Sequence, residues 1–149
     1  MKKMILPFLM FSLLLGANLS FAQEDKQAFN KRVVTEFYQK AINEKDFAAA
    51  EWYLGPWYIQ HNPLAADGID GLKQYIDYLK VTYPQSHSEI KRVLAEGDYV
   101  ILHVHSIKEP GTQGQAIIDI FRLEHNKIVE HWDVIQSIPV ESANSNGMF

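Results

Sequence analysis

The stretch AIIDIFRLEHNKIVEHWDVIQ, residues 116–136, carries the pattern that decides the fold. Apolar and polar side chains alternate on both sides of a short polar segment at residues 124–127. A period of two is typical of strands, because successive side chains of a strand point to opposite faces of a sheet. The stretch therefore predicts a hairpin of two strands, at residues 115–124 and 127–138.

Two further alternating runs come before this hairpin. They predict strands at residues 87–95 and 99–108, and turn-forming segments at residues 96–98 and 110–114 separate the four strands. Because each strand follows the previous one through a short connection, we expect an antiparallel meander in the second half of the chain.

The first half shows the three-to-four-residue apolar spacing of amphipathic helices. It predicts three helices, at residues 28–43, 46–53 and 70–82. Asp46 and Asp70 are expected to cap the second and third, and WYIQHNP, residues 57–63, to be a connector. Helices followed by such strands predict an α+β fold, with about three helices packed on a curved antiparallel sheet that encloses a cone-shaped pocket.

The N-terminal segment has the three-part plan of a secretory signal peptide. Lys2 and Lys3 precede an apolar run at residues 4–15, which is short for a membrane span of about 20 residues. Small side chains at Ser20 and Ala22 stand three and one positions before a cleavage site. We therefore expect cleavage after Ala22, export to the periplasm or the medium, and no membrane span in the mature protein.

The remaining chain, residues 23–149, has the length of a single domain, with an expected core at residues 29–138 and a flexible tail at 139–149. It contains no cysteine, so its stability cannot come from disulfides. The full sequence has a net charge of −4, and loss of Lys2 and Lys3 makes it −6, which argues against nucleic acid as a partner. The full sequence has three Trp, seven Tyr and eight Phe, of which three Phe lie in the N-terminal segment. The others supply aromatic surface beyond one core, which favours a pocket for a small, largely apolar ligand.

Three titratable residues on adjacent predicted strands form the candidate catalytic site. His103 and His105 in YVILHVHSIKE share a face by alternation, and Asp119 is a lone carboxylate in an apolar row of the next strand. Burial raises the pKa of a carboxyl group, which makes Asp119 a candidate general acid or base. A structural role, with the side chain hydrogen-bonded in the core, is the alternative for each of these residues.

Four other residues are expected to bind the substrate. Tyr58, Phe121 and Trp132 would form apolar walls, and His61 would lie at the pocket mouth. The pattern of the last strand leaves open which of its two mixed faces looks inward: Glu130, Trp132, Val134 and Gln136, or His131, Asp133 and Ile135.

A metal site is an alternative interpretation of the histidines. The spacing from Gly97 through His103 and His105 to Glu109 matches the opening of the cupin metal motif, but its later glycine is missing. The helical first half also differs from a jelly roll. We expect no metal, and His103, His105 and Asp119 would be the ligands if one is bound.

Four segments together resemble the SnoaL-like polyketide cyclase family, within the wider group that has the nuclear transport factor 2 fold. They are WYIQHNP, DGIDGLKQYI, GDYVILHVHS and AIIDIFRLEHNKIVEHWDVIQ, and the resemblance covers about residues 29–138. It implies three helices over a strongly curved sheet and a dimer formed through the sheet. It also implies metal-free and cofactor-free aldol ring closure, with Asp119 as acid/base and His105, or His103, beside it.

The sequence therefore predicts an exported, cofactor-independent acid/base enzyme of the aldol/cyclase, isomerase or related lyase type. Its substrate would be a small apolar carbonyl compound, and export makes a polyketide a poor candidate. A periplasmic binding protein that uses the same pocket without chemistry is the main alternative, followed by a metal-dependent enzyme and by an assembly module.

Overall fold

The computed structural model describes residues 26–149, so the predicted signal peptide at residues 1–22 lies outside the described part. The helical elements are a helix at residues 26–38 that continues as the π-helical turn η1 (Gln39–Asn43), α2 (Phe47–Ala50), the 3-10 turn η2 (Glu51–Tyr53) and α3 (Gly68–Thr82). The strands are β1 (Leu54–Gln60), β2 (His87–Glu96), β3 (Tyr99–Ile107), β4 (Gln115–Glu124) and β5 (Lys127–Ser137). Among these residues, no helix has the length and apolar character needed to cross a membrane.

The five strands form one sheet in the order β1-β5-β4-β3-β2. The strands β2 to β5 pair antiparallel, as the sequence predicts. The prediction of a purely antiparallel sheet is wrong at one edge, because β1 pairs parallel to β5. Residues 57–60, which were expected to be part of a connector, belong to this strand. The Gly55-Pro56 pair interrupts the alternation by which a strand is recognised, and the proline is tolerated because β1 lies at a sheet edge.

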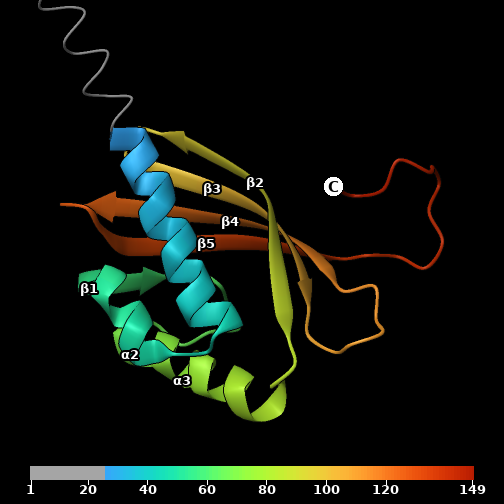
Figure 1. Cartoon of the computed structure of the whole chain (residues 1–149), viewed down its shortest axis with the longest axis horizontal. Coiled ribbons are helices and arrows are strands. Elements are labelled where there is room, and N and C mark those ends of the chain that lie inside the picture. The colour runs from blue at the N-terminus through green and yellow to red at the C-terminus, as the bar shows by residue number, and fades with distance from the viewer. Residues whose placement is uncertain (1–25) are drawn as a thin grey trace, which may run out of the picture.

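The helices cover one face of the sheet (Figure 1). Phe37 of the N-terminal helix packs edge-to-face on Phe121 of β4, with ring centroids 5.8 Å apart. Asn43 ties the end of this helix to β2, because it donates to the carbonyl oxygen of Ser88 at 2.9 Å and accepts from the Ser88 N–H at 2.8 Å. These contacts fix the helix over the sheet and define the space in which a pocket can form.

One of the two predicted helix caps is present. Asp46 accepts a hydrogen bond from the backbone N–H of Ala49 at 3.1 Å, as expected for an N-cap. The prediction for Asp70 is wrong, since α3 begins at Gly68 and its N-cap position is Asp67. Asp70 instead lies in the first turn, where a negative charge interacts favourably with the helix dipole.

Gly71 is required where α3 meets the preceding loop. A Cβ at this position would lie 2.1 Å from the carbonyl oxygen of Ala66. Replacing a helical glycine by alanine usually stabilises by about 1 kcal/mol. Here we expect Gly71→Ala to lower the free energy of unfolding by about 2 kcal/mol, because the backbone must move.

Urea denaturation of the full chain measures this effect. Gln74→Ala, on the exposed face of the same helix, is the matched control and should change stability by less than about 0.5 kcal/mol. A Gly71→Ala variant as stable as the wild type would contradict the close approach of loop and helix.

Candidate functional site

A cavity of about 130 Å³ lies between the helices and the inner face of the sheet. Its apolar walls include Phe37, Leu72, Ile117, Phe121 and Ile135, from helices and strands alike. A cavity of about 150 Å³ is known to admit a molecule of the size of benzene. The space therefore suits a small organic ligand with one ring.

Asp119 lies in the wall of this cavity, in the middle of β4, and is 5% exposed. Its Oδ1 is 3.0 Å from Nε2 of His131 on β5, and its Oδ2 is buried with no hydrogen-bond partner among the described residues. Burial raises the pKa of the Asp119 carboxyl above its usual value, while the hydrogen bond and the charge of His131 oppose this rise. The carboxyl group is therefore suited to exchange a proton nearer to neutral pH.

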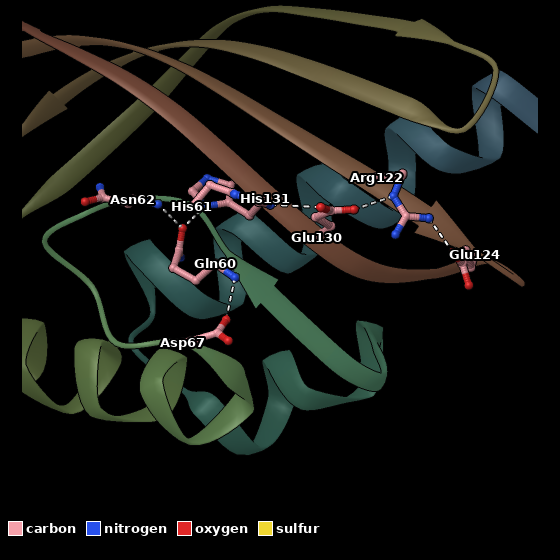
Figure 2. Close-up of polar contacts among 8 residues, drawn as sticks. All are labelled: Gln60, His61, Asn62, Asp67, Arg122, Glu124, Glu130 and His131. Atoms are coloured by element: carbon pink, nitrogen blue, oxygen red, sulfur yellow. Dashed lines mark hydrogen bonds and ion pairs between the residues drawn. The ribbon is translucent and has the colours of Figure 1, made fainter.

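His131 is held on both sides. Its Nδ1 lies 3.0 Å from Oε1 of Gln60, at the end of β1 (Figure 2). Its ring also contacts the ring of Phe121, at a centroid distance of 4.7 Å, and is stacked with that of Tyr58, at 6.5 Å. These contacts leave the imidazole little freedom beside Asp119.

Asp133 brings a second carboxylate to the cavity. It follows His131 on the same face of β5 and pairs with Asp119 across the strands. Its Oδ2 accepts a hydrogen bond from the side-chain amide of Asn62 at 2.6 Å. The last residue of β1 and the loop after it therefore support the two polar side chains, His131 and Asp133, that β5 contributes.

Three tyrosines line the same cavity: Tyr38 and Tyr58 are buried, and Tyr75 is half-buried. Burial raises the pKa of Tyr75 to about 12, and burial likewise raises the pKa of Tyr38 and Tyr58 above the usual range. All three side chains therefore stay protonated at neutral pH and can act as O–H donors.

The predicted grouping of His103 and His105 with Asp119 is wrong. Asp119 pairs directly with Leu102, so it shares the face of Leu102, whereas His103 and His105 lie on the opposite face of β3. The alternation within each strand was correct, but a shift of one residue in the pairing exchanges the two faces. The alternative metal site of His103, His105 and Asp119 fails for the same reason.

The two histidines have other partners on the outer face. Nδ1 of His103 is 3.0 Å from the Arg92 guanidinium, and Nε2 of His105 is 2.9 Å from the carbonyl oxygen of Gln113. Both rings contact Phe149, the last residue of the chain.

The predicted substrate-binding residues divide between the two faces. Tyr58 and Phe121 line the cavity, as expected. His61 and Trp132 do not: their rings stack on each other at 4.6 Å, away from the cavity, and Nε2 of His61 is 2.8 Å from Oε1 of Glu130. Glu130 continues this outer-face network to Arg122 (Figure 2).

Sequence reasoning missed six polar residues that the site description uses: Tyr38, Gln60, Asn62, Tyr75, His131 and Asp133. The alternation of β5 had already placed His131 and Asp133 on one face, but both faces of that strand mix polar and apolar groups. Gln60 and Asn62 lie in the segment that was expected to be a connector. Only the pairing of β1 with β5 shows that they meet His131 and Asp133.

A metal ion also has a possible set of ligands here. Within the described residues, Asp119, His131 and Asp133 offer ligand atoms that lie within 4.8 Å of one another. One imidazole and two carboxylates suit a divalent transition metal. Each group also has a hydrogen-bond partner that accounts for its position, so proton transfer is the simpler interpretation.

Comparison with known proteins identifies the family and the fold. The model of the SnoaL-like polyketide cyclase family matches residues 32–144. A search of curated proteins finds no significant match.

Solved structures with the same fold come from several bacteria. TsrD from Streptomyces laurentii has a TM-score of 0.62 at 23% identity, over 73% of this chain and 89% of that one. A SnoaL-like protein of unknown function from Burkholderia thailandensis has a TM-score of 0.64 at 19% identity, over 74% and 97%. An NTF2-like protein of unknown function from Cytophaga hutchinsonii has a TM-score of 0.60 at 19% identity, over 72% and 89%. They confirm the predicted α+β fold, here as three helices on a mixed sheet, and the family match together with the cavity supports a small-molecule-binding protein.

The raised pKa of Asp119 has a consequence for stability. Folding raises the pKa of this carboxyl group, so its ionisation costs more free energy in the native state than in the unfolded state. The protein therefore loses stability as the pH increases from the pKa of the unfolded state through the pKa of the folded state. Asp119→Asn removes this cost. We expect the variant to be more stable than the wild type at pH 7 by about 1 kcal/mol, which is typical when a destabilising residue of a functional site is replaced.

Thermal or urea unfolding at several pH values tests the sign. The advantage of the variant should vanish below about pH 3.5, where the carboxyl group is protonated in both states. A variant that is less stable than the wild type at pH 7 would show that the ionised carboxylate stabilises the fold.

Proposed function

Because the chain belongs to the SnoaL-like polyketide cyclase family, we propose that it is a cofactor-independent acid/base enzyme acting on a small, largely apolar carbonyl compound. The observation that carries this proposal is Oδ2 of Asp119, a buried carboxylate oxygen without a partner among the described residues, in the wall of a cavity. Its companion Oδ1 is held by His131 at 3.0 Å. This arrangement supports Asp119 as the group that exchanges a proton with the substrate.

The reaction begins with transfer of a proton from the carbon next to the carbonyl group to Oδ2 of Asp119. The C–H electron pair then forms an enolate, whose oxygen needs hydrogen-bond donors. The neutral phenols of Tyr38, Tyr58 and Tyr75 are among the donors in the wall of the cavity. Asp119 returns the proton to another carbon in an isomerisation, or to the oxygen formed in an aldol step.

His131 takes the role that the sequence assigned to His105 or His103. It contacts Asp119 directly, and its positive charge, when it holds two protons, offsets the charge that develops on the enolate. The size of the cavity and its apolar walls favour a substrate with a single ring.

Deuterium exchange gives a direct activity test. The full chain is incubated with cyclohexanone or acetophenone in D₂O, and NMR follows the loss of the protons next to the carbonyl group. Asp119→Asn should slow the enzyme-dependent exchange at least about 100-fold, the usual contribution of a general base. His131→Gln should also lower it strongly.

His105→Gln is the matched control, because it changes a histidine on the opposite face of the sheet. It should leave the exchange rate within about two-fold, as expected away from the reacting groups. An exchange rate equal to that of the wild type in Asp119→Asn would overturn the role of Asp119. A large decrease of the rate in His105→Gln would indicate that the histidines of the outer face take part in the reaction.

A binding protein without catalytic activity is the second candidate, and the same enclosed cavity supports it. Native mass spectrometry of protein purified from the exported fraction distinguishes the candidates. A retained organic ligand that is released unchanged, with no exchange activity, would favour binding alone. A stoichiometric transition metal that is lost in His131→Gln would favour a metal-dependent enzyme at Asp119, His131 and Asp133.

The same spectra test the proposed export. We propose that the protein is periplasmic or secreted and that cleavage follows Ala22, on the basis of the charged, apolar and small-residue segments at the N-terminus. The exported fraction should contain a chain that starts at Gln23.

A homodimer through the outer face of the sheet completes the proposal. This face exposes apolar side chains from several strands, including Trp57, Ile118 and Val134, the last of which is 69% exposed. Burying such a surface against a second copy would remove it from water. Within residues 26–149 the helices cover only the other face (Figure 1). On the outer face Phe149 contacts His103 and His105, and the rest of that face is open to a partner.

We expect Val134→Asp to convert the dimer into a monomer, because a carboxylate in the interface would lack a counter-charge. Analytical ultracentrifugation measures the mass. Val81→Asp is the matched control, since Val81 is 82% exposed on α3, and it should leave the dimer intact. A wild-type protein that remains monomeric at high concentration would contradict this assembly.

A further inference from the structure

Gln60 stands next to His131, which in turn contacts Asp119, and both ends of its side chain are hydrogen-bonded. Its Oε1 accepts from the backbone N–H of Asn62 at 2.8 Å and lies 3.0 Å from Nδ1 of His131. Its Nε2 donates to the hydroxyl oxygen of Tyr58 at 3.3 Å. Figure 2 shows the side chain of Gln60 directed towards His131 and Asn62.

The contact with Asn62 fixes the orientation of the Gln60 amide. A backbone N–H can only donate, so the atom of Gln60 that faces it must be the carbonyl oxygen. The reversed amide would place its NH₂ group against another donor. The same oxygen faces His131, so Nδ1 of His131 must be the donor in that contact and carries a proton.

This protonation state determines what happens on the other side of the ring. A neutral histidine with its proton on Nδ1 has a lone pair on Nε2, and that atom lies 3.0 Å from Oδ1 of Asp119. Two lone pairs cannot form a hydrogen bond, so one further proton must lie between the two groups, on either the carboxyl or the imidazole. The opposite tautomer would donate from Nε2 to an ionised carboxylate without any additional proton.

Backbone contacts fix the position of Gln60 beside His131. Gln60 pairs with His131 in the parallel register of β1 and β5. Its backbone N–H also donates to Oδ1 of Asp67 at 2.8 Å, which ties the end of β1 to the start of α3. The position of the amide therefore follows from the strand register and from the neighbouring loop.

We propose that Gln60 is a positioning residue that holds His131 in the form protonated at Nδ1 and thereby obliges Asp119 and His131 to share one proton. Its meaning for catalysis rests on the proposed function, in which this shared proton keeps Oδ1 engaged and leaves Oδ2 to exchange a proton with the substrate. The tautomer itself follows from the geometry alone.

Nitrogen-15 NMR of the histidine side chains tests the tautomer without any substrate. Spectra of the full chain are recorded near neutral pH in buffer with EDTA, and the His131 signals are assigned by their loss in His131→Asn. We expect Nδ1 of His131 to be protonated in the wild type. Gln60→Glu should keep this proton, because a carboxylate accepts the same hydrogen bond, whereas Gln60→Leu should shift His131 to the form protonated at Nε2 alone.

Gln136→Leu is the matched control, since Gln136 is exposed near the end of β5, and its spectrum should equal that of the wild type. A wild-type His131 that is protonated at Nε2 alone would overturn the proposal. So would a Gln60→Leu spectrum identical to that of the wild type.

The exchange assay adds a kinetic readout. Gln60→Leu should lower kcat about ten-fold with little change in KM, and Gln60→Glu should recover most of the rate. A wild type protonated at Nδ1 but without exchange activity would overturn the proposed reaction and leave the role of Gln60 in fixing the tautomer intact. Exchange activity in a wild type whose His131 Nδ1 is unprotonated would overturn the role of Gln60 and leave the proposed reaction intact.

Discussion

The parallel pairing of β1 with β5 is the constraint on which the site depends. It sets Gln60 opposite His131 and brings the following loop, with Asn62, to Asp133. Without this edge strand and its loop, His131 would lose the partner of its Nδ1 and Asp133 would lose its hydrogen bond from Asn62. The short connection from β1 to α3, held by the bond from the Gln60 N–H to Asp67, also closes the cavity on one side.

The two faces of the sheet carry different sets of residues, because the pleat of the strands directs successive side chains to opposite faces. The inner face carries Asp119 and His131 under the helices, where burial raises the pKa of the carboxyl group. The outer face carries the stacked pair His61 and Trp132 beside the ion pairs of Glu130. Because neighbouring residues of a strand point in opposite directions, the sequence HWD supplies both faces at once.

Much of the fold could be predicted because its signals are local. The four strands from β2 to β5 begin and end within two residues of their expected limits, and Asp46 caps α2 as its position before an apolar run suggests. Asp119, Tyr58 and Phe121 also lie where expected, in the wall of a pocket. The partner of Asp119 was not predictable, because alternation shows which residues of one strand share a face but not which face of the next strand they meet.

The sequence by itself determined an α+β chain of helices followed by a meander, with one carboxylate set in an apolar row. Periodicity and turn chemistry contain that information, since both act between residues close in the chain. Only the tertiary structure decided that His131 rather than His105 meets Asp119, and that Gln60 stands beside it. The contact of His131 with Asp119 joins residues only 12 positions apart, but alternation within each strand does not encode the register that creates it. The parallel addition of β1 depends on contacts between residues 71 positions apart, such as Gln60 and His131, and no local pattern encodes it.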